Sequence, residues 1–166
     1  MIEYYISLLT SNSLKVFLLS MFPITELRFS IPYGYFVLNE SIATVSIISI
    51  FGNILVGVLI IYIIGPIMNI LIKIYPLSYI INKIFKRTKH KGKIINNLKM
   101  LGLIIFIGIP LPFTGVWTGS LASYLFGFSK IRSVVSVCLG VLISSFIIAL
   151  ICMFSNKLLS FLGFQV

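Results

Sequence analysis

The chain has 166 residues, of which 59% are hydrophobic and only 10% are charged, and its formal net charge is +10. A soluble domain carries about 25% charged residues and about 50% apolar residues at most, so this composition excludes a water-soluble domain. It also excludes an intrinsically disordered chain, which would be poor in apolar residues. We therefore expect one compact membrane domain spanning residues 1–166.

The N-terminal stretch, residues 2–22, is apolar but does not have the pattern of a signal peptide. It begins with Glu3 in place of a basic cluster, and it lacks a cleavage site of small residues. We expect a retained N-terminal helix, which is a marginal span because Lys15 interrupts it.

Two segments, residues 41–64 and 133–154, contain no charged residue and predict transmembrane helices. About 20 apolar residues are enough to cross the hydrocarbon core of a bilayer. Gly52 and Gly57 in the first segment allow close helix contact. Cys138 and Cys152 in the second have no metal-like spacing, and we expect them to pack as small hydrophobic side chains. The predicted fold class is an all-α integral membrane protein.

The middle of the chain, residues 65–99, predicts a connector between a first half, residues 1–64, and a second half, residues 100–166. Residues 65–85 contain Pro66 and Pro76, and their polar residues recur at helical spacing, which favours an amphipathic helix on the membrane surface. Residues 83–99 hold seven basic residues and no acid. Because basic residues collect in cytoplasmic loops, we expect this loop inside the cell, in contact with anionic lipid and not with nucleic acid.

Two shorter apolar segments are residues 22–36 and 104–127. In each, apolar residues are interrupted by proline and glycine. Broken backbone is tolerated within lipid only where protein or a water-filled cavity satisfies its polar groups. We therefore predict that both segments are re-entrant hairpins, each entering and leaving the membrane on one side. The residues predicted to break the chain are Pro23, Pro32, Gly34, Pro110, Pro112 and Gly119.

The two halves resemble each other at an offset of 89 residues, which aligns Pro23 with Pro112 and Thr25 with Thr114. With residues 83–99 inside, the first span runs inward, and Lys130 starts the second span on the inside, so that span runs outward. The sequence thus predicts an inverted repeat, in which transporters hold substrate near the middle of the membrane between broken segments.

The first hairpin contains two charged residues, Glu26 and Arg28. Ionisable residues at membrane depth are candidates for function, although the two charges could instead pair and only stabilise the hairpin. A carboxyl shielded from water takes up a proton readily, so Glu26 is the predicted proton-coupling group. The planar guanidinium of Arg28 suits a phosphate or a carboxylate, and the hydroxyls of Thr25 and Ser30 complete the predicted substrate-binding set of this hairpin.

The second hairpin contains no charged residue between positions 110 and 120. Gly115 and Gly119 permit tight turns. Thr114, Thr118 and the backbone N–H groups at Gly115 are predicted to bind an anion at the start of a half-helix. The alternative is that the glycines and threonines only allow close packing, and Trp117 is predicted to be a packing aromatic.

The sequence lacks the motifs that are typical of several functional classes. The sequence has no GxxxxGK[ST] motif and no His, Cys and Asp cluster with metal spacing, and its one histidine, His90, lies in the basic loop. We therefore expect no enzymatic activity, no metal and no cofactor.

The segments PITELRFSIPYGY (residues 23–35) and GIPLPFTGVWTGSLASYLFG (residues 108–127) resemble the signature regions of the small multidrug export protein family, which is similar to the DedA/VTT superfamily. The resemblance implies facing re-entrant hairpins in a prokaryotic cytoplasmic membrane. It also implies movement of a lipid phosphate, such as a polyprenyl phosphate, driven by the proton motive force. DedA proteins usually carry an arginine in the second hairpin region, and this chain has none there.

The sequence as a whole predicts a small transporter or lipid flippase with a site between the hairpins. The expected partners are a membrane lipid, anionic or carrying polyprenyl phosphate, and a small amphipathic substrate. Two spans enclose little volume, which favours a homodimer. The alternative is a scaffold that transports nothing, or the membrane subunit of a larger complex.

Overall fold

The computed structural model describes residues 2–71 and 93–161, and every regular element in these residues is helical. The elements are α1 (Ile2–Met21), α2 (Glu26–Pro32), the π-helical segment η1 (Tyr33–Val37), α3 (Ile42–Leu71), α5 (Lys93–Gly108), α6 (Val116–Leu125) and α7 (Lys130–Phe161). For the described residues, the predicted all-α class is confirmed.

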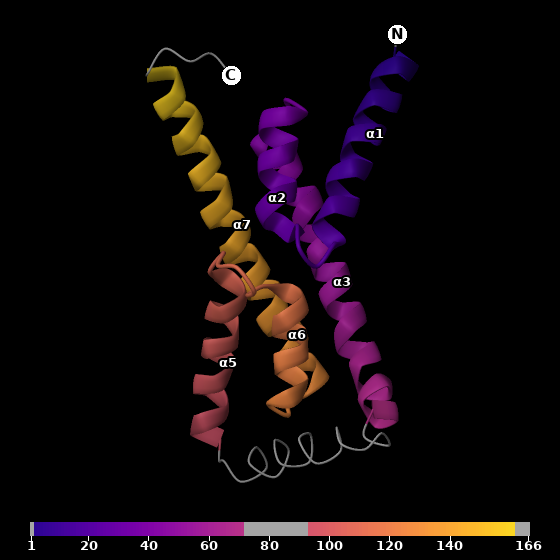
Figure 1. Cartoon of the computed structure of the whole chain (residues 1–166), viewed down its shortest axis with the longest axis vertical. Helices are drawn as coiled ribbons and strands as arrows, with labels where there is room; N and C mark the ends of the chain where they lie inside the picture. Colours follow the sequence, from indigo (N-terminus) through magenta and orange to yellow (C-terminus); the bar gives the residue numbers. More distant parts are fainter. Residues whose placement is uncertain (1, 72–92, 162–166) are drawn as a thin grey trace. The chain divides into compact units, whose positions relative to one another are not determined.

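The element order repeats along the chain (Figure 1). A helix ends at an interruption, a shorter helix follows, and a loop of four residues leads into a long helix. The first set is α1, the interruption at residues 22–25, α2 with η1, and α3. The second set is α5, the interruption at residues 109–115, α6 and α7.

Two of the helices are long and apolar enough to cross a membrane, and their spanning parts are Ile42–Met68 and Lys130–Ser155. Both predicted spans are therefore present, but each helix is longer than predicted. The prediction that a new segment begins at residue 65 was wrong, because α3 continues through Pro66 to Leu71. Proline is tolerated inside helices of membrane proteins because neighbouring groups satisfy the carbonyl that it leaves free.

The predicted connector is described only in part. Residues 65–71 belong to α3, residues 93–99 form the first turns of α5, and residues 72–92 lie outside the described part of the chain. The prediction of a surface helix therefore stays open for residues 72–85. The last basic residues of the connector are helical.

The chain divides into two compact units that do not follow its two halves. Unit 1 comprises Met1–Leu55 and Val141–Val166, and unit 2 comprises Val56–Gly140. The helices α3 and α7 each contribute residues to both units. Each unit contains one interrupted pair of helices and part of each long helix.

In unit 1, α1 and α2 are the antiparallel arms of a helical hairpin whose tip is residues 22–25 (Figure 1). The first half of α3 approaches the last turns of α1 closely at Gly52. A Cβ atom at Gly52 would overlap the Ser20 hydroxyl and lie 2.9 Å from the carbonyl oxygen of Phe17. Only glycine permits this approach without displacement of α1.

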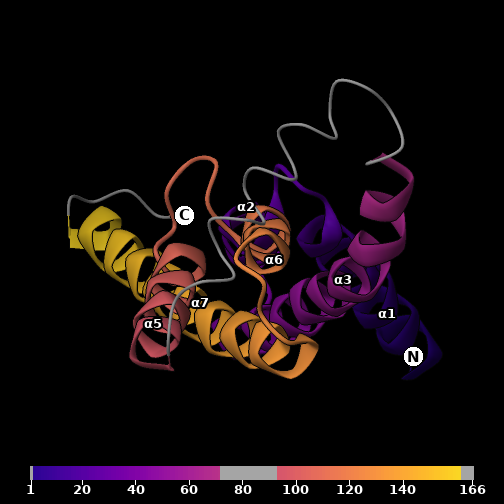
Figure 2. The same cartoon turned by 90° about the horizontal axis from the view of Figure 1, so that it is seen from below.

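In unit 2, α6 lies between α5 and the second half of α3 (Figure 2). The Ser120 hydroxyl of α6 donates a hydrogen bond of 3.3 Å to the carbonyl oxygen of Gly57 in α3. The first half of α7 approaches α5 at Gly140, where a Cβ atom would lie 2.6 Å from Cβ of Ile107. Gly140 lies ten residues after the start of α7, and Gly52 lies ten residues after the start of α3. Both repeats therefore use a glycine at the same helical position to contact the preceding arm.

Candidate functional site

Three residues predicted to break the chain lie within helices. Pro32 is the last residue of α2, Gly34 lies in η1, and Gly119 lies in α6. The glycines are needed for packing: a Cβ atom at Gly34 would overlap Val45, and one at Gly119 would overlap Ile107. The structure thus places Pro32 at the junction of α2 and η1, and Gly34 and Gly119 inside helical segments. Pro23, Pro110 and Pro112 do lie in the interruptions.

The interruptions at residues 22–25 and 109–115 form the tips of the two hairpins. Each tip is stabilised by hydrogen bonding of a threonine hydroxyl. The Thr25 hydroxyl donates to the carbonyl oxygen of Leu19 at the end of α1. The Thr114 hydroxyl lies 2.9 Å from the carbonyl oxygen of Ile109 and 2.7 Å from that of Leu111. The Thr25 hydroxyl therefore ties its tip to α1, whereas the Thr114 hydroxyl closes a turn within the interruption at residues 109–115. Both threonines have a structural role that the sequence analysis did not assign to them.

Glu26 begins α2 in a strained and buried position. Its φ angle is 43°, in the left-handed region that residues other than glycine rarely adopt. Its side chain is only 5% exposed. Such strain costs about 1–3 kcal/mol and is concentrated at functional sites. A carboxyl group that is both buried and held by strained backbone is the strongest candidate for chemistry in unit 1.

The face of α2 and η1 that carries Glu26 packs against α3 in an antiparallel register. Gly34 meets Val45 in van der Waals contact, and the Ser30 hydroxyl donates a hydrogen bond of 2.8 Å to the Ser49 hydroxyl. Four residues back along α2 from Ser30 is Glu26, and four residues forward along α3 from Ser49 is Asn53. A step of four residues is about one helical turn, or about 6 Å. Continued by one turn along both helices, this register would place Glu26 near the level of Asn53.

Asn53 is a residue that the sequence analysis missed. Its side chain is 0% exposed, and neither its amide nitrogen nor its amide oxygen has a hydrogen-bond partner among the described residues. An unsatisfied buried polar group costs about 1–3 kcal/mol. The signal in the sequence was the presence of one asparagine within a charge-free apolar span of 24 residues.

Arg28 lies on the same helix but is less buried than Glu26. Burial of part of the Arg28 guanidinium opposes its charge, and the attraction of Glu26 favours that charge to a smaller extent. The two residues are therefore coupled electrostatically within unit 1. Of the predicted substrate-binding residues of this hairpin, Ser30 uses its hydroxyl to contact α3.

In unit 2, the predicted residues lie at the start of α6. Gly115 precedes the helix with φ 126° and ψ −164°, a conformation that favours glycine. The Thr118 hydroxyl lies 3.5 Å from the carbonyl oxygen of Gly115. The predicted binding residues thus fall into two sets, one in each unit. Among the described residues, no group of three or more His, Cys, Asp or Glu side chains could hold a metal ion.

Two long apolar helices, each preceded by an interrupted helical pair, define an integral membrane protein with a buried carboxyl group in its first hairpin. The chain belongs to the family described as "Putative small multi-drug export protein", which matches residues 26–147. The family's name is that of a transporter. No curated protein and no solved structure is significantly similar to the chain.

Proposed function

We propose that this protein is a small secondary transporter in which proton binding at Glu26 is coupled to the movement of an amphipathic substrate. The single observation that carries the proposal is the burial of Glu26, whose side chain is 5% exposed. A buried carboxyl is more stable when protonated, and desolvation opposes its ionisation. The protonated form has an O–H donor, and the Asn53 amide oxygen is an acceptor without a hydrogen-bond partner among the described residues.

Coupling follows if the two protonation states favour different arrangements of the hairpin. When Glu26 is protonated, it carries no charge and is compatible with an apolar, closed environment. When Glu26 is ionised, it requires water or a cation, which favours exposure of the site. A protein that alternates between these states exchanges one proton for each change of exposure, and no enzymatic step is needed.

Within this proposal the two hairpins are re-entrant and form an inverted repeat. The repeated element order and the matching positions of Gly52 and Gly140 support this arrangement. The tips support it too, because each carries a fully exposed apolar side chain: Ile24 is 92% exposed and Phe113 is 90% exposed. Such side chains are unfavourable in water and are stabilised in hydrocarbon. The basic residues 83–99 then place the connector in the cytoplasm.

The proposed substrate is an amphipathic molecule that carries either a phosphate, as in a lipid phosphate, or a positive charge. Arg28 distinguishes the two, because lysine lacks the planar fork that binds a phosphate through two hydrogen bonds. Transport of a phosphate-bearing lipid should fall by about tenfold in Arg28→Lys, the loss of one charge-assisted hydrogen bond. Transport of a cationic substrate should not change in this variant. A homodimer is part of the same proposal, since two spans enclose little volume.

The test is proton-coupled transport in proteoliposomes under an imposed pH gradient. Glu26→Gln should abolish the dependence of transport on the gradient, because glutamine cannot exchange a proton. Glu40→Gln is the matched control: Glu40 accepts a hydrogen bond of 3.2 Å from Asn12 in the same unit, and its removal should leave coupling intact. Transport by Glu26→Gln at the wild-type rate under the gradient would refute the coupling role.

The second candidate is a membrane scaffold or the membrane subunit of a larger complex. It is favoured by the attraction between Glu26 and Arg28, which is also what a purely structural pair would provide. Under this alternative, replacement of Glu26 by Gln together with Arg28 by Met should preserve both the stability of the protein and its cellular phenotype.

A further inference from the structure

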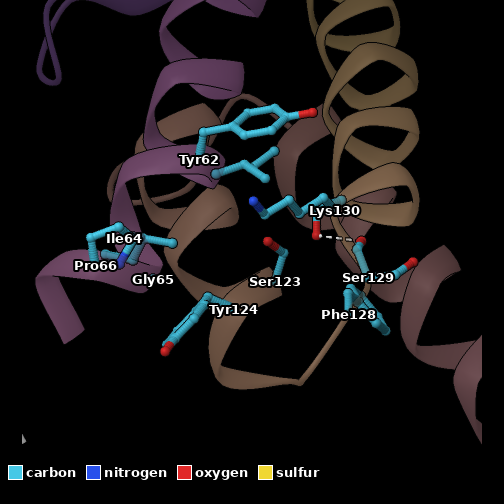
Figure 3. Close-up of a pocket in the computed structure, with 11 residues that line it drawn as sticks. Tyr62, Ile64, Gly65, Pro66, Ser123, Tyr124, Phe128, Ser129 and Lys130 are labelled. Carbon is cyan, nitrogen blue, oxygen red and sulfur yellow. Dashed lines mark hydrogen bonds between the residues drawn. The ribbon is translucent and has the colours of Figure 1, made fainter. Parts of the chain in front are cut away.

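Unit 2 contains a cavity of about 370 Å³ that lies outside the first hairpin (Figure 3). Three elements enclose it: the second half of α3, the end of α6, and the turn that leads into α7. Its size falls within the range of about 300–1,000 Å³ that is typical of small-molecule sites. The residues that give it chemical character are Tyr62, Ser123, Tyr124, Lys130 and Ser133.

The cavity holds a positive charge that the surrounding residues do not neutralise. The side chain of Lys130 extends between Tyr62 and Ser123 (Figure 3), and its ammonium nitrogen lies 4.6 Å from the centre of the Tyr62 ring. The three acidic residues of the chain, Glu3, Glu26 and Glu40, all precede residue 56, so the sequence of unit 2 contains no carboxylate side chain. An anion that pairs with Lys130 must therefore come from outside this unit.

The position of Lys130 in α7 indicates the chemistry of that anion. Lys130 is the first residue of the apolar span Lys130–Ser155, and Tyr62 lies near the end of the span Ile42–Met68. The end of a span lies at the level of the lipid headgroups, where lysine and tyrosine are enriched. The first N–H groups of a helix lack intrahelical acceptors and favour negative charge, and α7 begins beside the cavity. Phosphate is the anionic group at this level of a bilayer.

We propose that this cavity binds the phosphate group of an anionic ligand, with the Lys130 ammonium as the charged donor. The apolar side chains that share the cavity, Ile61 and Ile64, contact the less polar part of the ligand. A headgroup that also carries a positive charge is disfavoured, because unit 2 has no carboxylate side chain that could pair with that charge. The cavity lies in unit 2, whereas the proposed proton-coupling group Glu26 lies in unit 1.

The test is native mass spectrometry of the detergent-purified protein titrated with phosphatidylglycerol, with phosphatidylcholine as the zwitterionic comparison. The wild type should bind phosphatidylglycerol more tightly than phosphatidylcholine. Lys130→Gln should weaken phosphatidylglycerol binding by about tenfold or more, the loss of one charge-assisted hydrogen bond. The matched control is Arg132→Gln: it removes the same charge two residues along α7, from a side chain that is exposed and does not line the cavity. The affinity of Arg132→Gln for phosphatidylglycerol should stay within about twofold of the wild-type affinity.

A competition experiment with soluble phosphates distinguishes a lipid headgroup from a free phosphate as the ligand. If millimolar inorganic phosphate or glycerol phosphate displaces the lipid from the wild type but does not bind Lys130→Gln, the natural ligand is a soluble phosphate and the proposed chemistry holds. If only the lipid binds, the ligand is a headgroup. Equal losses in Lys130→Gln and Arg132→Gln would overturn the proposal. Equal binding of the two lipids by the wild type would overturn it as well, whether or not the variants fold.

Discussion

Ser30 and Ser49 are joined by a buried hydrogen bond of 2.8 Å between their hydroxyls, and this bond sets the register of α2 on α3. It lies between the contact of Gly34 with Val45 and the helical turns that carry Glu26 and Asn53. A hairpin that breaks and re-forms its packing during transport would have to break this bond. The relationship therefore links the stability of the first hairpin to the environment of its carboxyl group.

A double-mutant cycle on this pair should show a measurable coupling. Ser30→Ala and Ser49→Ala should each destabilise the protein by about 1 kcal/mol, because each leaves a buried hydroxyl without its partner. The double variant should lose less than the sum, with a coupling energy of about 0.6 kcal/mol and at most about 1.7 kcal/mol, the average and the maximum of such measurements within a membrane protein. Thermal unfolding in detergent gives the values. Strictly additive losses would show that the hydroxyls do not interact.

Replacement of Asn53 by leucine should separate stability from function. Leucine has a similar volume and removes an amide without a described partner, so the melting temperature should stay the same or rise. In the proposed cycle the protonated Glu26 donates a hydrogen bond to the Asn53 amide oxygen, so the loss of that amide should lower proton-coupled transport about tenfold. Wild-type transport by Asn53→Leu would contradict the role of Asn53. A large loss of stability would indicate that its amide is structural.

The glycine contacts predict opposite effects for the same substitution at different positions. Gly52→Ala and Gly140→Ala should each destabilise the protein by about 1–3 kcal/mol, since the added methyl overlaps the preceding helical arm. Gly102→Ala is the control, because a Cβ atom there has no neighbour within 4 Å. It should be neutral or should stabilise α5 by up to about 1 kcal/mol. Similar melting temperatures for all three variants would contradict these close approaches.

The backbone before α6 should tolerate only glycine at position 115. With φ 126° and ψ −164°, Gly115→Ala should cost about 1–3 kcal/mol of stability. Gly127→Asn is the comparison, because Gly127 has φ 71°, in the left-handed region that asparagine adopts more readily. Circular dichroism during heating should show a clear loss of stability for the first variant and a smaller one for the second. The reverse order would contradict the geometry at the second tip.

The apolar composition and the charge-free segments were sufficient to predict the helical class and both long helices. Their ends were not predictable in the same way, because Pro66 looks like a boundary in the sequence but lies inside α3, and α7 begins at Lys130, before the charge-free segment. In a membrane, helical hydrogen bonds are retained wherever the chain would otherwise expose polar backbone, so proline is a weaker boundary there than in water. Pro32 is the last residue of α2, and helical backbone continues beyond it in η1.

The sequence by itself determined that this protein is helical and apolar, that its charges are few, and that Glu26 and Arg28 lie between two unusual prolines. Those properties follow from composition and local spacing, which residues carry independently of their neighbours in space. Only the tertiary structure decided that Glu26 is buried in strained backbone, that Asn53 is fully buried without a hydrogen-bond partner among the described residues, and that Lys130 extends into a cavity beside Tyr62. These properties depend on which helical faces pack together, and residues far apart along the chain jointly determine that packing.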